Sequence, residues 1–258
     1  MKTYTNAMKL AALLLAATAL PCGAAEIRVL SAAVMQTVFK DVAHDFERAS
    51  GHKLTFVYDT MGAITTRVLG GETADVIIGS TPSLARLVKE GKVDATTTLA
   101  IARVGVGVVV PTGTPKPAIA SADELKSALL AAKIVVYADP AGGAAAGIHV
   151  GQVIERFGIA ADLAPKTRFG RGGDITEVTL AQGPGALGLT QISEMVGKPG
   201  AEFVGPLPEA LQNYTGITAG IPAHVTQVDA ANALIRFLQG AAARSSMKAL
   251  GMDPVGGE

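Results

Sequence analysis

The stretch from residue 27 to residue 58, IRVLSAAVMQTVFKDVAHDFERASGHKLTFVY, decides the fold class of this 258-residue chain. It opens with an apolar run, residues 27–30, which suits a buried strand. Apolar residues then recur at helical spacing, with charged residues on the opposite face: Met35, Val38, Phe39, Val42 and Phe46. A Ser-Gly pair ends this helix, and residues 54–58 form a second apolar run. Strand, helix and strand in this order predict a parallel α/β unit.

The same alternation continues along the chain. Further strands are predicted at residues 74–78, 103–110, 134–138, 186–190 and 214–221. Further helices are predicted at residues 64–69, 82–89, 122–131, 145–157, 175–181, 230–239 and 241–250. These two α/β units predict two lobes, each a mainly parallel sheet flanked by helices, with crossover strands at the hinge near 106–110 and 214–220. Lobe 1 is expected to take residues 26–108 and 217–258, and lobe 2 residues 109–216.

The first 25 residues have the pattern of a cleavable secretory signal peptide. Lys2 and Lys9 give a positive start, and residues 10–20 form an apolar block that is too short for a membrane span of about 20 residues. Small residues precede Glu26, so we expect cleavage before Glu26. The mature chain is therefore expected in the periplasm, without a membrane span.

Composition narrows the class of protein. Hydrophobic residues make up 49% of the chain and charged residues 17%, which is typical of a well-packed α/β protein. The 22 basic and 22 acidic residues balance, which argues against a nucleic-acid-binding protein. The one cysteine, Cys22, lies in the predicted signal peptide, so the mature chain is expected to form no disulfide. No metal-ligand spacing, dinucleotide fingerprint or nucleophile elbow occurs, and we expect no metal and no cofactor.

Four loops follow predicted strands, where ligands bind in such sheets: residues 31–34, 59–63, 140–147 and 170–174. The sharpest signal is PAGGAAAG at 140–147. Its small residues let backbone N–H groups approach an anion at a helix start, where the dipole also favours negative charge. We therefore predict ligand contacts at Gly143, Ala146 and Gly147. The alternative is a flexible turn with a helix cap.

Side chains in the other loops are further candidates for ligand binding. Thr60, Met61 and Gly62 precede a helix in the same way, with Thr60 as a hydroxyl donor or a plain N-cap. Arg171 can offer a forked donor to a carboxylate, or it is an exposed loop arginine. Tyr214 at the predicted hinge can donate to a ligand or pack in the core.

Two side chains are the predicted acid–base groups. His149 lies in the first turn of the helix after the glycine-rich loop, where the dipole favours a neutral imidazole that can accept a proton. The alternative is a partly buried histidine bonded to the backbone. Glu177 and Glu194 both lie near the predicted cleft, where either could be a base, and for each the alternative is a surface acid. His44 and His52 are predicted to be surface residues.

The chain resembles the periplasmic molybdate-binding proteins of ABC transporters, a branch of the two-lobed type II solute-binding fold. The resemblance rests on the order and spacing of residues 29–52, 62–80, 103–115, 137–159, 186–194 and 231–240. It implies a small anionic ligand and, for a transport receptor, an ABC permease as partner.

Three positions depart from that family's pattern. Val34 stands where the family has a Ser, residues 60–62 replace a second Ser, and Gln191 stands where it has a Tyr. Each lost hydrogen bond to a charged ligand costs about 1.5–3 kcal/mol. Molybdate is therefore not the expected ligand, although Val34 and Gln191 are still expected at the site.

The run QISEM…VGPLPEALQNYT, within residues 191–215, resembles a divergent branch of the family that includes aconitate isomerase. That resemblance implies an isomerase of trans- and cis-aconitate that works by an allylic proton shift without a cofactor, for which His149 or Glu177 would be the base. The alternative is a non-catalytic ABC-transporter receptor for a molybdate-like oxyanion or an organic acid.

Overall fold

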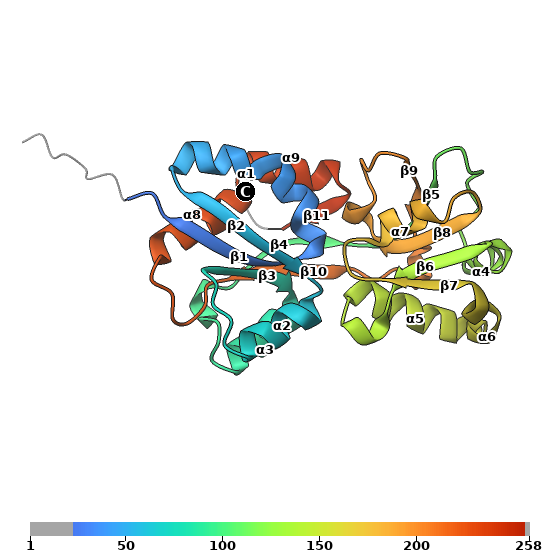
Figure 1. Cartoon of the computed structure of the whole chain (residues 1–258), viewed down its shortest axis with the longest axis horizontal. Coiled ribbons are helices and arrows are strands. Elements are labelled where there is room, and N and C mark those ends of the chain that lie inside the picture. Colours follow the sequence, from blue (N-terminus) through green and yellow to red (C-terminus); the bar gives the residue numbers. More distant parts are fainter. Residues whose placement is uncertain (1–22, 256–258) are drawn as a thin grey trace, which may run out of the picture.

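The computed structural model describes residues 23–255, which form two lobes, each built on its own β-sheet (Figure 1). Cys22 and most of the predicted signal peptide lie outside the described residues. Within residues 23–255, no helix has the length and apolar character needed to cross a membrane.

The sheet of the first lobe has six strands in the order β11-β4-β10-β3-β1-β2. Three neighbours run parallel: β3 (Val76–Ser80), β1 (Glu26–Ala32) and β2 (Lys53–Asp59). The other three pair antiparallel: β11 (Met252–Pro254), β4 (Leu99–Val104) and β10 (Thr215–Gly220). One face is covered by α1 (Gln36–Ser50), α8 (Val228–Leu238) and α9 (Ala241–Ala249), and the other by α2 (Met61–Leu69) and α3 (Thr81–Lys89) (Figure 1).

The sheet of the second lobe has five strands in the order β7-β6-β8-β5-β9. Their bounds are β5 Val106–Pro111, β6 Ile134–Ala138, β7 Thr167–Gly170, β8 Ala186–Gln191 and β9 Ala201–Pro206. The helices α4 (Ala122–Ala131), α5 (Ala145–Phe157) and α6 (Ala160–Leu163) supply one hydrophobic core, and α7 (Ile175–Ala181) packs on the opposite face of the sheet.

Local sequence explains the helix boundaries. The apolar stripe of α1 is buried at Val38, Phe39, Val42 and Phe46, and Gly51 ends the helix with φ 77°, a left-handed conformation that glycine adopts without strain. In α4, Ser121 and Glu124 form a capping box with the first-turn backbone. The predicted helices 122–131, 145–157 and 175–181 are confirmed at these bounds.

The two-lobed α/β fold is confirmed, but both sheets are mixed rather than mainly parallel. The run 103–110 is two strands interrupted at Gly105: β4 belongs to the first sheet and β5 to the second. The chain therefore crosses between the sheets at Gly105, and it returns between β9 and β10. Gln212 ties the two crossings together, since its amide accepts from Val106 N (2.8 Å) and donates to Val106 O (2.9 Å).

His52 is buried, which corrects the prediction of a surface residue. Its Nδ1 accepts from the backbone N of Ala25 at 3.2 Å, and the carbonyl of Ala25 accepts from Lys53 N at 2.8 Å. Ala25 is itself buried. A mature chain beginning at Glu26 would lose these contacts.

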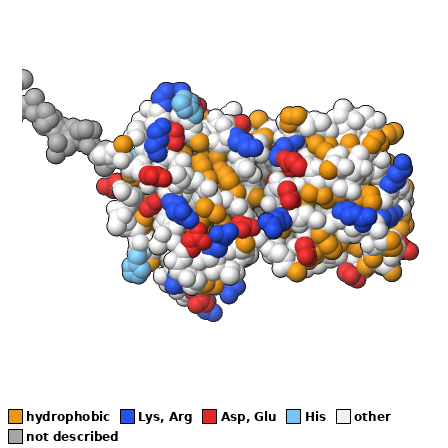
Figure 2. Space-filling model, in the orientation of Figure 1, with side chains coloured by type: hydrophobic (Ala, Val, Ile, Leu, Met, Phe, Trp, Pro, Cys, Tyr) orange, Lys and Arg blue, Asp and Glu red, His pale blue; other side chains and the backbone are white. Residues whose placement is uncertain are grey.

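Charges are mixed over the surface. Figure 2 shows basic and acidic side chains interspersed on one face of both lobes, in keeping with the balance of 22 basic and 22 acidic residues. Hydrophobic side chains lie among them on this face.

Candidate functional site

A cavity lies between the two lobes, where loops at the ends of their parallel strands face one another. About 450 Å³ of atom-free space lies in it, a figure that includes open solvent at its mouth. The first lobe lines it with Ala32, Ala33, Val34, Asp59, Thr60, Met61, Ser80, Thr215 and Ile217. The second lobe lines it with Ala138, Ala144, Ala145, Ala146, Gly172, Thr190, Gln191 and Glu194.

The starts of three helical segments lie at this cavity. The 3-10 turn Ala33–Met35 that leads into α1, the helix α2 and the helix α5 all begin at the cavity. The N-cap residues Ala32 and Ala144 offer no side-chain hydrogen bond, so first-turn N–H groups stay free for a ligand. No Lys or Arg is among the described residues that line the cavity. Main-chain amides and helix dipoles are therefore what favours an anion here.

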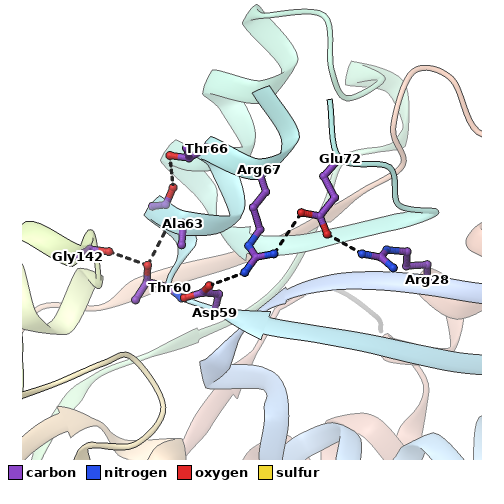
Figure 3. A network of polar contacts seen from close by, with 9 residues as sticks. Arg28, Asp59, Thr60, Ala63, Thr66, Arg67, Glu72 and Gly142 are labelled. Atoms are coloured by element: carbon purple, nitrogen blue, oxygen red, sulfur yellow. Dashed lines mark hydrogen bonds and ion pairs between the residues drawn. The ribbon is translucent and has the colours of Figure 1, made fainter. Parts of the chain in front are cut away.

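The lobes are in contact beside the cavity. The Thr60 hydroxyl of the first lobe donates to the carbonyl of Gly142 in the second at 2.6 Å, and it accepts from Ala63 N at 3.2 Å (Figure 3). The Ser193 hydroxyl donates to the carbonyl of Val34 across the same gap at 3.1 Å. The structure thus shows the two lobes closed on each other.

Glu194 is a buried acid in the cavity wall, 7% exposed. It ends the 3-10 turn Ile192–Glu194 that follows β8. Burial raises the pKa of Glu194 to about 7, against the opposing effects of the Thr190 hydroxyl and Lys198. Thr190 Oγ1 donates to Oε2 of Glu194, and Thr176 Oγ1 donates to the Glu194 backbone carbonyl at 2.8 Å. The carboxyl is therefore fixed in place and changes charge near neutral pH.

Asp59 is the second acid in the lining, but its oxygens are already engaged. Oδ1 accepts from Thr60 N at 2.8 Å, and Oδ2 lies 3.4 Å from an Arg67 guanidinium nitrogen. Arg67 also pairs with Glu72, which in turn pairs with Arg28 (Figure 3). Asp59 thus belongs to a charged network on the surface of the first lobe.

Five of the residues predicted from the sequence line the cavity: Val34, Thr60, Met61, Ala146 and Gln191. Gln191 is buried, and its side-chain amide makes no hydrogen bond with any described residue, so it is free for a ligand. The sulfur of Met61 packs over Gly79 of β3, which anchors its side chain in the core of the first lobe.

Three predicted glycines have packing roles beside the cavity. A Cβ on Gly62 would meet Gly143 Cα at 3.0 Å, so these two glycines allow the lobes to touch. Gly143 also has φ 74°. Gly147 lets α5 approach the carbonyl of Ala138 at the end of β6. None of the three is part of the cavity lining.

The two predicted bases have other partners in the structure. His149 Nε2 is 2.7 Å from the carbonyl of Leu211, so this side chain is the backbone-bonded histidine of the alternative interpretation. Glu177 is exposed and forms an ion pair with Lys198. Neither lines the cavity.

Tyr214 and Arg171 also stand apart from the cavity lining. Tyr214 is 53% exposed, and the Arg103 guanidinium lies 4.8 Å from its ring centroid. Arg171 is exposed and lines an outer depression that it shares with Asp59 and Thr60.

Sequence reasoning named Glu194 as a possible base but preferred His149 and Glu177, and it noted Thr190 near the cleft without including it among the site residues. Glu194 was noted, but a single acid beyond a strand does not reveal its burial. The signal available in the sequence was the strand pattern of residues 186–190. Residues just past the end of such a strand lie at the edge of the sheet where ligands bind. No cluster of three or more His, Cys, Asp or Glu within residues 23–255 could hold a metal ion.

The sequence profile of the family described as bacterial extracellular solute-binding protein matches residues 27–253. The chain belongs to this family, whose members are extracellular or periplasmic. Within it, the chain is 30% identical over 258 residues to an aconitate isomerase from a Pseudomonas species, with 96% of each sequence covered. The predicted relationship to the branch that includes aconitate isomerase is thereby confirmed.

Solved structures show the same fold. The periplasmic molybdate-binding protein of Azotobacter vinelandii matches with a TM-score of 0.71 and 16% identity, covering 90% of this chain and 100% of that one. The sulfate-binding protein SubI of Mycobacterium tuberculosis matches with a TM-score of 0.70 and 23% identity, covering 90% and 87%. At these identities the likeness concerns the fold.

Proposed function

We propose that this chain is a cofactor-independent isomerase that interconverts trans- and cis-aconitate by an allylic proton shift. One observation carries the proposal: a chain 30% identical to an aconitate isomerase over nearly its whole length has a buried carboxyl, that of Glu194, in the wall of a cavity lined with amides. A receptor needs only donors to hold its ligand. An isomerase also needs a side chain that moves a proton at a ligand carbon.

The chemistry of the cavity lining suits a small polycarboxylate. The free N–H groups at the starts of α5 and of the turn before α1 can donate hydrogen bonds to carboxylates, and the Gln191 amide adds a neutral donor. Removal of a proton next to a carboxylate develops enolate-like charge, which the same fixed dipoles stabilise. Contact between the lobes keeps water away while the proton moves.

The same lining disfavours a tetrahedral oxyanion held by hydroxyls. Val34 presents an apolar side chain, and its carbonyl is already engaged by Ser193. Gln191 supplies an amide where the molybdate receptors have a phenol. We therefore place molybdate below a planar tricarboxylate in the expected order of affinity.

The second candidate is a non-catalytic ABC-transporter receptor for a small anion, favoured by the fold shared with molybdate- and sulfate-binding proteins. In either role we propose that the N-terminal signal peptide delivers the chain to the periplasm, where a receptor would meet its permease.

The test adds purified protein to trans-aconitate and follows cis-aconitate by chromatography, with boiled protein as control. We expect conversion that is proportional to protein concentration and unaffected by a chelator. Calorimetry with molybdate, sulfate, citrate and both aconitates then ranks the ligands. Tight binding of any of these anions with no conversion at high protein concentration would favour the receptor and overturn the isomerase.

A further inference from the structure

We propose that Glu194 is the catalytic base of this site and that Thr190 is the residue that positions it. The inference rests on the proposed isomerase function and assigns its proton transfer to a particular carboxyl. It replaces His149 and Glu177, both of which lie outside the cavity lining.

The geometry of Glu194 fits a base. Its side chain is buried in the cavity wall, and the backbone on either side is held by hydrogen bonds from Thr176 to Glu194 O and from Ser193 to Val34 O. Thr190 engages Oε2, whereas Oε1 has no hydrogen-bond partner among the described residues. One oxygen is thus fixed and the other is left for a ligand. A carboxyl with a single orientation suits proton transfer at a defined carbon.

The groups around Glu194 support the same role. Lys198 favours its charged form, whereas Asp174 and Glu177 disfavour it, and burial exceeds all of these effects. A group that titrates near the working pH is the most effective proton carrier. Asp59, the other carboxyl of the lining, has both oxygens engaged by Thr60 N and Arg67. Glu194 is therefore the cavity acid with an oxygen to spare.

The proton transfer balances without a co-reactant. The Glu194 carboxylate takes a proton from the methylene carbon of aconitate, and the C–H electron pair becomes the new carbon–carbon double bond. The electron pair of the former double bond binds a proton at the far carbon. The Glu194 carboxyl supplies that proton and returns to its charged form. No atom or electron is gained or lost overall.

The experiment measures turnover and affinity for three variants beside the wild type. Glu194→Gln is expected to lower kcat at least 100-fold while the Kd for trans-aconitate, by calorimetry, stays within about 3-fold. Glu202→Gln, a half-buried acid on β9 paired with Lys116, is the matched control and should leave kcat unchanged. Thr190→Val removes the hydroxyl at nearly constant volume and is expected to lower kcat about 10-fold.

The pH profile separates positioning from packing. The Thr190 hydroxyl lowers the pKa of Glu194, so its removal should move the acidic limb of kcat/KM to higher pH. Thr190→Ser should restore the limb, which a purely structural role would not predict.

The possible outcomes distinguish this inference from the proposed function. A wild-type enzyme that converts trans-aconitate, with a Glu194→Gln variant that keeps more than a tenth of kcat, would overturn the assignment and leave the isomerase intact. If Thr190→Val leaves the acidic limb of kcat/KM in place, the positioning role of Thr190 is overturned and the isomerase is left intact. A wild-type chain that binds trans-aconitate without converting it would overturn the isomerase and this inference with it.

Discussion

Glu194 combines a cost to the stability of the fold with the catalytic role that we propose for it. A carboxyl that is buried with one neutral hydrogen bond destabilises the fold whenever it is charged, because its ionised form loses hydration. Such groups persist where function needs them. At this scale the sequence could identify which residues follow strand ends, and Thr60, Ala146 and Gln191 were found in that way. Burial and hydrogen-bond partners decide between Glu177 and Glu194, and for Glu194 they depend partly on Thr176 of α7, which lies 18 residues earlier in the chain.

The pH dependence of stability tests the burial of Glu194. Its folded pKa of about 7 lies above the ordinary glutamate value of 4.5, so its contribution is fully present below pH 4.5 and is lost as the pH rises through 7. Glu194→Gln should therefore be more stable than the wild type at pH 8.5, by about 3 kcal/mol, and equal to it near pH 4.5. Urea unfolding at both pH values measures the difference. A difference that does not vary with pH would show that Glu194 is not buried in the folded protein.

At the scale of elements, the start of α2 meets the turn before α5 beside the cavity. Thr60, at the N-cap of α2, donates to Gly142, and Gly62 in the first turn touches Gly143. Helical periodicity predicted both helices, and the turn residues before them predicted where they start. Contact between them could not be predicted, because it depends on how two separate sheets face each other. For the same reason residues 103–110 looked like one strand, although the chain changes sheets at Gly105.

Gly62→Ala tests whether contact between these elements matters for binding. The added methyl would meet Gly143 Cα at 3.0 Å and Gly142 O at 3.2 Å, which hinders closure, while alanine suits a helix better than glycine. We expect a Kd for trans-aconitate about 10-fold weaker by calorimetry, with no loss of thermal stability. Gly142→Ala is the control, since a Cβ there meets nothing within 4 Å. Equal affinities in the two variants would contradict closure through this contact.

At the scale of the whole molecule, the lobes are joined by Gly105 and by the segment between β9 and β10. Gln212 in that segment hydrogen-bonds both backbone groups of Val106, which makes it the tie between the two connections. The alternation of strands and helices was enough to predict two lobes. The antiparallel strands β9 and β11 were not predicted, because the strand pattern in their own sequences is weak. They are stabilised by pairing with neighbouring strands.

Gln212→Ala tests this tie. Loss of two hydrogen bonds to the backbone should lower the free energy of unfolding by about 1–3 kcal/mol. Gln182→Ala is the control, because Gln182 is exposed and bonds only the carbonyl of Val178 in its own helix, at 3.3 Å. Denaturant unfolding compares the two variants. If Gln182→Ala is as destabilised as Gln212→Ala, the claim that Gln212 ties the two connections is contradicted.

The central claim is that a side chain in the cavity between the two lobes moves a proton on a bound tricarboxylate. Proton NMR of the wild-type protein tests it most directly, with one sample started from trans-aconitate and another from cis-aconitate. We predict that the vinyl signals of both samples approach the same final ratio, at a rate proportional to protein concentration. Two spectra that stay unchanged at high protein concentration would contradict the claim.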